Sequence, residues 1–381
     1  MDRPSAAGTN SRDAVAGLVY DGKLSELFGI FLFNLPLTII TFGIFHCWTV
    51  TRMRRYMWSH MRFEGTPFRY TGRGKEMLQG FVLALLILIL LFASAAVAEE
   101  ALKKSHPIQA RLPFATAFVG MVVLFGATRF ASLRYRLSHT EWCGISGGIY
   151  GSALRYGASW MIYLLVCVLT FAQAVPWMQV GLARSRIDAS HFGSAEFHWD
   201  GRGWPLYLSW LAMMFGHIVL FGVIVAIVAG FEAPWLAHVL LGKSSGPIAH
   251  SVAFQVTPAA VGGLVFMVGS AILVTSYQAK CRLLILGNIT AIVRGRFRNE
   301  TLQFGTTAEV DGLTWLVFTN LAIMMLSLGL GLPIVLHRNA SFTARTTYVT
   351  GIFDANTLAQ GTMAPATFGN GFVQTLDPGM I

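Results

Sequence analysis

The side chains of this chain that could carry chemistry are mainly arginines, grouped in short clusters at the ends of long apolar segments. A guanidinium in such a place can contact an anionic lipid headgroup or complement the negative end of a helix dipole. We interpret the clusters first as headgroup contacts. The alternative is that clusters from different segments converge to hold an anionic solute. The arginines predicted to make these contacts are Arg52, Arg54, Arg55, Arg134, Arg136, Arg184 and Arg282.

Few polar side chains interrupt the apolar segments, and three of them could line a pathway or join helices. Asn34 and Asn320 are candidates for a hydrogen bond between helices, and His217 could titrate inside the membrane. Independent packing is the favoured alternative for the asparagines, and a bond to a backbone carbonyl is the favoured alternative for the histidine. No Asp or Glu lies in the middle of an apolar segment, which weakens a carboxylate proton relay of the kind that pumps use.

Motifs typical of enzymes are not complete in this sequence. The run Gly72-Arg73-Gly74-Lys75 lacks the spacing of a phosphate-binding loop. The run Gly144-Ile145-Ser146-Gly147-Gly148 is not a nucleophile elbow. His139 and Cys143 have helical spacing but lack the further ligands of a zinc site. We therefore predict no catalytic residue, no cofactor and no metal, and do not expect an enzyme.

The composition indicates that a membrane protein holds these residues. The 381 residues are 54% hydrophobic and only 12% charged, with a mean hydropathy of +0.58, whereas a soluble domain is about 25% charged. The net charge of +10 is explained by anionic lipid, so we predict membrane lipids as partners and no nucleic acid.

Seven apolar stretches are long enough, or nearly so, to cross a bilayer as helices. We therefore predict an all-α polytopic membrane protein with about seven apolar helices, in a range of about six to eight, and short interfacial Phe/Gly-rich segments. Alternating aromatics in 66–70 and 196–199 favour short interfacial strands or hairpins. The stretches run approximately from Leu27 to Trp48, Leu78 to Ala98, Leu112 to Phe130, Trp160 to Val180, Trp204 to Gly230, Val252 to Tyr277 and Leu313 to Leu336.

An internal repeat of three helices organises these stretches. Sliding the chain by 129 residues places Phe42 on Phe171 and Arg55 on Arg184, and sliding it by 286 places Asn34 on Asn320. The predicted parts are a polar N-terminal segment (1–23), repeat one with helices one to three (24–157), repeat two with helices four to six (158–311), a terminal helix as a partial third copy (312–338) and a flexible tail (339–381).

Two membrane topologies follow from this order and stay open. If all seven stretches cross, the repeats are inverted, as in many secondary transporters, but Lys and Arg are then equally divided between the two sides. If the first, fourth and seventh stretches are re-entrant, only Lys103, Lys104, Arg111 and Lys243 lie outside, which the positive-inside rule prefers. Against this second topology, a re-entrant turn must be shielded by protein, and only the first stretch has a midpoint suited to turning, at 34–36.

Particular motifs resemble the YjgN family of bacterial inner-membrane proteins over about residues 20 to 350. The chain departs from the family pattern at Cys143, where many relatives carry a basic residue. The resemblance implies a multi-pass inner-membrane location and brings no assigned activity. The matching motifs are Asn34 with Thr41-Phe42-Gly43-Ile44, Trp48 and Arg52-Met53-Arg54-Arg55-Tyr56, then Leu133 to Trp142, and Phe192-Gly193 with Phe197.

Two functional hypotheses follow from these observations. The first is a transporter or channel for a small solute or a lipid, because the repeats place Asn34 and Asn320 at equivalent positions. The alternative is a non-transporting envelope scaffold or lipid-interacting membrane protein, because acidic coupling residues are lacking in the apolar stretches. The sequence does not indicate a substrate or an oligomeric state.

Overall fold

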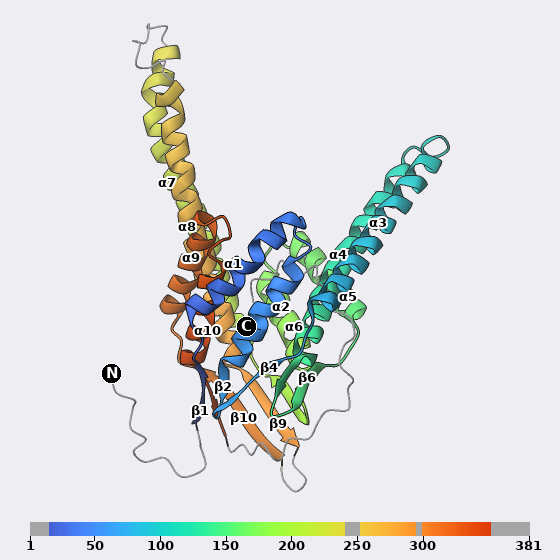
Figure 1. The fold of residues 1–381 in the computed structure, drawn as a ribbon. Coiled ribbons are helices and arrows are strands. Elements are labelled where there is room, and N and C mark those ends of the chain that lie inside the picture. Colours follow the sequence, from blue (N-terminus) through green and yellow to red (C-terminus); the bar gives the residue numbers. More distant parts are fainter. Residues whose placement is uncertain (1–14, 241–251, 295–298, 352–381) are drawn as a thin grey trace. The chain divides into compact units, whose positions relative to one another are not determined.

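An antiparallel sheet organises the computed structural model, which describes residues 15–240, 252–294 and 299–351. Its eleven strands follow the order β3-β2-β1-β11-β10-β9-β8-β7-β6-β5-β4. Because β3 and β4 are two halves of the extended segment 66–70, this order returns to its start and the sheet is nearly a barrel (Figure 1). The strands are β1 Val15–Tyr20, β2 Met61–Phe63, β3 Thr66–Pro67, β4 Arg69–Tyr70, β5 Thr140–Trp142, β6 Ile145–Ile149, β7 Ser190–Phe192, β8 Ala195–Trp199, β9 Ile289–Arg294, β10 Asn299–Thr306 and β11 Thr347–Thr350.

This sheet shows that the predicted all-α fold is wrong. The alternation in 66–70 and 196–199 was interpreted correctly, since both segments contain strands. The other strands are short, and their partners are distant in sequence: Val15 pairs with Thr350. A local pattern does not reveal such pairing. Residues 339–350, expected in a flexible tail, lie in helix and strand, while 352–381, 1–14 and 241–251 are outside the described residues.

Helices leave the sheet in pairs, and each pair returns to the neighbouring strand. The pair α1 and α2 joins β1 to β2, and the same holds for α3 and α4 between β4 and β5, α5 and α6 between β6 and β7, α7 and α8 between β8 and β9, and α9 and α10 between β10 and β11. The helices are α1 Leu24–Ile40, α2 His46–Ser59, α3 Gly74–Lys103, α4 Leu112–Ser138 after a 3-10 turn Gln109–Arg111, α5 Ala153–Leu169, α6 Val175–Ile187, α7 Trp204–Leu240, α8 Val252–Leu286, α9 Val310–Leu326 and α10 Leu332–Thr346.

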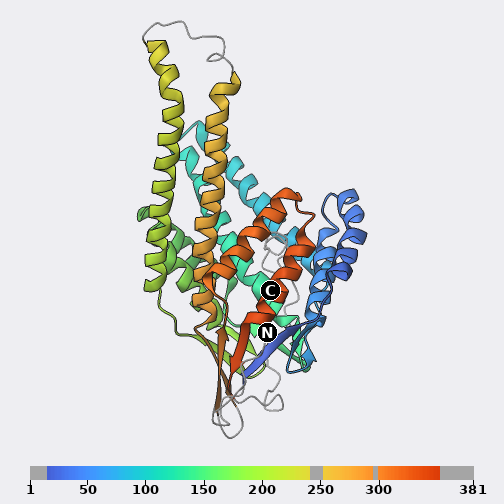
Figure 2. The same cartoon turned by 90° about the vertical axis from the view of Figure 1, so that its left-hand side faces the viewer.

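The described chain forms two compact units. One contains the whole sheet with α1 to α6 and α10 (Figure 2), and the other contains α7, α8 and most of α9. In the first unit, apolar residues of α1, α2, α10 and the start of α3 form one core cluster. A second cluster covers one face of the sheet, where alternate strand residues are apolar. Its members are Ala195, Phe197, Ala291, Val293, Leu302, Phe304, Val349 and Phe63.

Four helices, rather than seven, are long and apolar enough to cross a membrane in the part of the chain that is described. They cover Gly74–Lys103, Gln109–Ser138, Trp204–Gly230 and Ala260–Leu286. The other three predicted helices are each broken into two short ones. Their first halves have 17 residues, which span about 25 Å at about 1.5 Å per residue, less than the hydrocarbon core of about 30 Å.

The breaks share one backbone conformation. Phe42 and Gly43 have φ of 49° and 87°, and the corresponding pairs Phe171-Ala172 and Leu328-Gly329 are also left-handed. Two successive left-handed residues end a helix. Hydrophobicity alone could not predict these breaks, because the residues concerned are themselves apolar or small. The tip side chains are almost fully exposed: 98% for Phe42, 88% for Phe171 and 92% for Leu328.

Candidate lipid headgroup site

The first short hairpin carries a groove of about 510 Å³ between α1 and α2. On α2 its residues follow the i, i+3, i+4, i+7 spacing of one helix face. On α1, Ile30 and Asn34 are one turn apart. The sequence therefore places an apolar wall beside a basic one. The lining residues are Gly29, Ile30, Phe33, Asn34, Arg52, Arg55, Tyr56 and Ser59.

Asn34 holds the first of the two arginines in position. Its side chain is only 1% exposed, and its amide donates to the carbonyl of Ile30. The Nη1 of Arg52 donates to the Oδ1 of Asn34 at 2.6 Å. The guanidinium also lies 5.8 Å from the ring centre of Phe45. Arg52 itself is exposed, so a buried amide orients a cation that remains open to a ligand.

The second arginine is anchored at the other end of the groove. Arg55 is exposed, and its Nη2 donates to the carbonyl of Gly72 at 3.2 Å. Next to it, the hydroxyl of Tyr56 donates to the carboxylate of Glu26 at 2.9 Å and accepts from the backbone N–H of Lys23 at 2.7 Å. Both cations therefore keep donors for a further acceptor, since a guanidinium carries five N–H groups.

The two titratable groups beside the arginines keep fixed charge states at neutral pH. Burial, together with the Glu26 carboxylate, raises the pKa of Tyr56 above its ordinary value of 10.0. The hydrogen bond from Tyr56 lowers the pKa of Glu26 below its ordinary value of 4.5. At neutral pH the phenol is thus a neutral donor and the carboxylate is ionised. Glu26 is engaged with Tyr56 and with Lys23, at 3.5 Å, at the margin of the two-arginine face.

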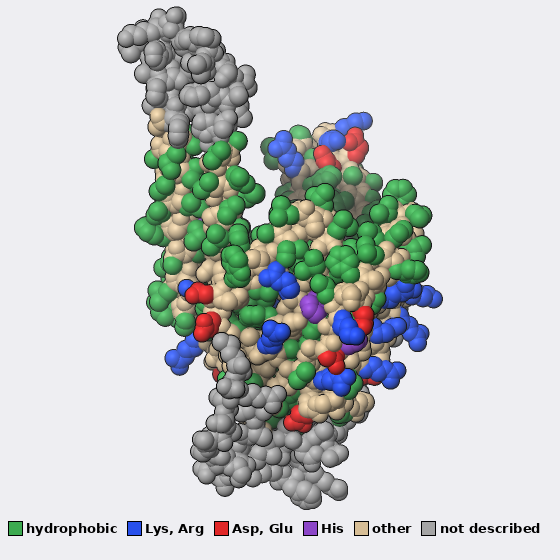
Figure 3. Space-filling view, turned by 60° about the vertical axis from the view of Figure 1, so that its left-hand side comes forward, with side chains coloured by type: hydrophobic (Ala, Val, Ile, Leu, Met, Phe, Trp, Pro, Cys, Tyr) green, Lys and Arg blue, Asp and Glu red, His purple; other side chains and the backbone are tan. Residues whose placement is uncertain are grey.

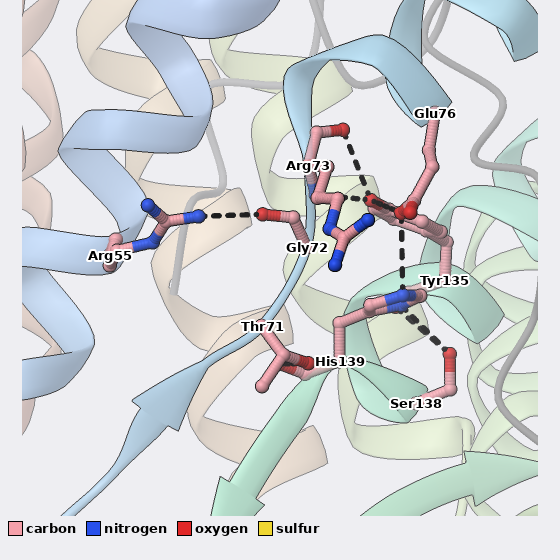
Figure 4. A network of polar contacts seen from close by, with 8 residues as sticks. All are labelled: Arg55, Thr71, Gly72, Arg73, Glu76, Tyr135, Ser138 and His139. Carbon is pink, nitrogen blue, oxygen red and sulfur yellow. Dashed lines mark hydrogen bonds and ion pairs between the residues drawn. The ribbon is translucent and has the colours of Figure 1, made fainter.

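A polar network adjoins the groove beyond Gly72 (Figure 4). The hydroxyl of Tyr135 accepts from the backbone N–H of Arg73 at 3.0 Å and donates to Glu76 at 2.7 Å. The same carboxylate lies 3.5 Å from the Nε2 of His139. This network joins the end of α4 to the start of α3. In the same way, Tyr56 at the end of α2 is joined to Lys23 and Glu26 at the start of α1.

The structure brings together three of the predicted site residues and separates the others. Asn34, Arg52 and Arg55 share the groove. Arg54 points away from it and is buried, only 1% exposed. Arg136 is half-buried and Arg282 exposed, and neither lines the groove.

Arg134 and Arg184 contact backbone rather than the groove. Arg134 donates to the carbonyl of Gly151 and lies over the Phe130 ring. Arg184 donates to the carbonyl of Gly201 at 3.5 Å and lies over the Trp199 ring. Both bonds span 17 residues, as does the bond from Arg55 to Gly72. The three arginines therefore share one role, which is to join a helix end to the segment that starts the next helix.

The other two predicted polar residues belong to the second unit. The Nδ1 of His217 lies 2.8 Å from the carbonyl of Met213, and its Nε2 lies 2.8 Å from the hydroxyl of Ser270. Since a carbonyl only accepts, Nδ1 carries a proton, and in the neutral imidazole Nε2 then accepts from the hydroxyl of Ser270. Asn320 is buried in α9, while Asn34 is in the first unit, so their pairing stays a prediction.

Several functional residues were missed from the sequence. Tyr56 and Ser59 could have been found, because they share a helix face with Arg52 and Arg55. The network around Tyr135 could not, because Glu76 lies 59 residues away and nothing local links the two. Within the described ranges no three His, Cys, Asp or Glu side chains are grouped to hold a metal ion.

Comparison with known proteins places the chain among bacterial membrane proteins. Residues 16–375 match the family model described as "Bacterial protein of unknown function (DUF898)". The chain is 24% identical over 372 residues to "Inner membrane protein YjgN" of Salmonella typhimurium, with 89% of each chain covered. No solved structure matches it.

Proposed function

We propose a function from the premise that this chain belongs to the DUF898 family of bacterial proteins, which its description leaves without an activity. The resemblance to YjgN is confirmed by the match over 89% of both chains. The protein is a multi-pass protein of the bacterial inner membrane, in keeping with the name of that relative and with its four long apolar helices. Our specific proposal is that the groove between α1 and α2 binds the headgroup of an anionic phospholipid.

The sidedness of the sheet supports this placement. Two strands that are hydrogen-bonded neighbours lie on the same side of a bilayer, and the helix pairs each start and end at neighbouring strands. Of the described Lys and Arg residues of the first unit, all except Lys103, Lys104 and Arg111 then lie on the sheet side. The positive-inside rule makes that side cytoplasmic. Figure 3 shows apolar side chains over the helices and most of the basic ones nearer the sheet.

The observation that carries the proposal is the pair of exposed arginines beside an apolar wall. A phosphodiester fits two guanidinium groups, which donate to phosphate oxygens as forks. Phe33 is exposed on α1 and lines the same groove as Arg52 and Arg55, so it offers a surface for an acyl chain. A phospholipid offers a phosphate to the arginines and an acyl chain to the apolar wall, whereas a free phosphate can contact only the arginines.

Native mass spectrometry of the purified protein with phosphatidylglycerol, and with phosphatidylethanolamine as the comparison, tests this binding. We expect wild type to retain phosphatidylglycerol preferentially. The double variant Arg52→Gln/Arg55→Gln should bind it at least about tenfold more weakly, since charge-assisted hydrogen bonds contribute about 1.5–3 kcal/mol each.

The matched control is Arg62→Gln/Arg69→Gln, which removes two charges from strands outside the α1–α2 groove. Arg62 pairs with Asp21 at 3.0 Å, and Arg69 pairs with Glu141 at 3.9 Å. Exposed pairs of this kind contribute little to folding. Equal losses in both double variants would mean that net charge, and not the groove, attracts the lipid.

We propose a binding function without a catalytic step. Transport of a small solute or a lipid stays a prediction that rests on polar residues in the apolar segments, such as Asn34. Flux across vesicles that contain the purified protein would test it, with Asn34→Ala/Asn320→Ala as the variant expected to lose transport.

A further inference from the structure

The short hairpins α1–α2 and α5–α6 present apolar tips that no part of the first unit covers among its described residues. Besides Phe42 and Phe171, the flanking residues Ile40 and Leu169 are exposed, 72% and 70%. Exposed apolar tips of this kind in a membrane protein have to meet either hydrocarbon or a partner. Their backbone and their charges distinguish between these two environments.

The backbone N–H groups of the first tip need no water. All five amide groups from Phe42 to His46 donate within the turn: to the carbonyls of Ile39, Thr38 and Thr41, to the hydroxyl of Thr41 and to the carbonyl of Gly43. Irregular backbone is excluded from hydrocarbon mainly because unsatisfied polar groups cost several kcal/mol each. This turn avoids that cost for its N–H donors.

The second tip repeats the same pattern. The amides from Phe171 to Val175 donate to Val168, Cys167 and Thr170, to the hydroxyl of Thr170 and to Ala172. Each tip therefore has a threonine whose hydroxyl caps the following helix. Such internal bonding of the N–H donors suits a turn that is surrounded by lipid chains, and a partner protein or water would not require it.

The cations on the returning helices limit how deep the tips can reach. From the start of α2 at His46 to Arg52 the rise is about 9 Å, and from Val175 to Arg184 on α6 it is about 14 Å. Half of the hydrocarbon core is about 15 Å. With the arginines at the headgroups, upright helices α2 and α6 start inside the first leaflet, so the turns that precede them reach no further than about the middle of the bilayer. By contrast, Lys75 and Lys103 on α3 are about 42 Å apart, which spans both leaflets.

Beyond headgroup binding, we propose that the hairpins α1–α2 and α5–α6 insert into the hydrocarbon of the sheet-side leaflet only, where they act as a one-sided wedge. They add volume to one leaflet and none to the other. A protein of this kind favours membranes whose sheet-side leaflet is convex or loosely packed. The inserted depth does not depend on which lipid the groove binds, because it is set by the tip residues and the positions of the cations.

Depth-dependent fluorescence quenching tests the insertion. The four native cysteines are replaced, and Phe42→Cys or Phe171→Cys carries an environment-sensitive fluorophore in reconstituted vesicles. We expect nitroxides on lipid acyl chains to quench both labels, and a water-soluble quencher to leave them bright. Quenching from water alone, or none from the acyl chains, would overturn the insertion. Reaction of the unlabelled Phe42→Cys protein with an impermeant maleimide added to the side opposite the sheet would overturn its one-sidedness.

Sorting between vesicles of different size tests the wedge itself. Protein reconstituted with its sheet outside should be enriched in small vesicles over large ones, and Phe42→Ser/Phe171→Ser should lose that enrichment. The matched control is Phe118→Ser, which changes a lipid-exposed phenylalanine of the long helix α4 (56% exposed). Enrichment that persists in vesicles without anionic lipid separates the wedge from headgroup binding. Equal sorting by wild type and the tip variant would overturn the wedge.

Discussion

At the scale of single residues, two tyrosines have equivalent partners, a carboxylate and a backbone N–H, but differ in how deeply they are buried. Tyr135 is 1% exposed and holds Glu76 and the N–H of Arg73. Tyr56 is half-buried and holds Glu26 and the N–H of Lys23. A partner that becomes unsatisfied costs most where water cannot reach it.

We therefore predict that Tyr135→Phe lowers the free energy of unfolding by about 1–3 kcal/mol and that Tyr56→Phe lowers it by less. Denaturant unfolding in one detergent, followed by tryptophan fluorescence, measures both. An equal loss of unfolding free energy in the two variants would show that burial does not make the hydrogen bonds of Tyr135 more stabilising than those of Tyr56.

The arginines show how far residue types alone could predict the site. Two of the seven predicted contacts, Arg52 and Arg55, line the groove, and Asn34 beside them was also named from the sequence. Arg134 and Arg184 were indistinguishable from them in the sequence. Their acceptors, the carbonyls of Gly151 and Gly201, become visible only when the next segment folds back onto the helix end.

At the scale of elements, the turns of the short hairpins differ at one position. Gly43 and Ala172 both have positive φ, 87° and 66°, in turns with the same hydrogen bonds. A left-handed conformation costs an alanine about 1–2 kcal/mol, while glycine adopts it freely.

Reciprocal substitutions should therefore have opposite effects. Gly43→Ala is expected to lower the free energy of unfolding by about 1 kcal/mol, and Ala172→Gly to raise it by up to about 1 kcal/mol. Thermal unfolding of the purified variants in one detergent provides the comparison. If both changes shift the midpoint in the same direction, the two turns are not equivalent.

The elements also explain why seven membrane-length helices were predicted where four of the described helices are long enough to cross. Apolar stretches were located well, since hydrophobicity marks whatever meets lipid. It does not mark where such a stretch turns back. At Ala172 even the residue type gives no signal, because the left-handed conformation is imposed by the capping hydroxyl of Thr170 and the following helix. The strands were mostly missed because pairs such as β1 and β11 join opposite ends of the chain.

At the scale of the whole molecule, the sheet decides the topology that the sequence left open. Seven full crossings would place β1 and β2 on opposite sides of the membrane, although Leu18 pairs with Phe63 in the sheet. They would also separate β6 from β7, in which Gly148 pairs with His191. The distribution of Lys and Arg favours the same topology, in which the short hairpins do not cross. An even number of crossings between neighbouring strands keeps most basic residues on one side.

The most direct test of this account is the sidedness of Ser59, Ser190 and Ser105 in a background without the four native cysteines. Ser59→Cys and Ser190→Cys lie beside the sheet, at the end of α2 and at the start of β7, and Ser105→Cys lies between α3 and α4. An impermeant maleimide should label the first two only in inverted membrane vesicles, and the third only in intact spheroplasts. Labelling of Ser59→Cys and Ser190→Cys from opposite sides would contradict a single sheet on the cytoplasmic side.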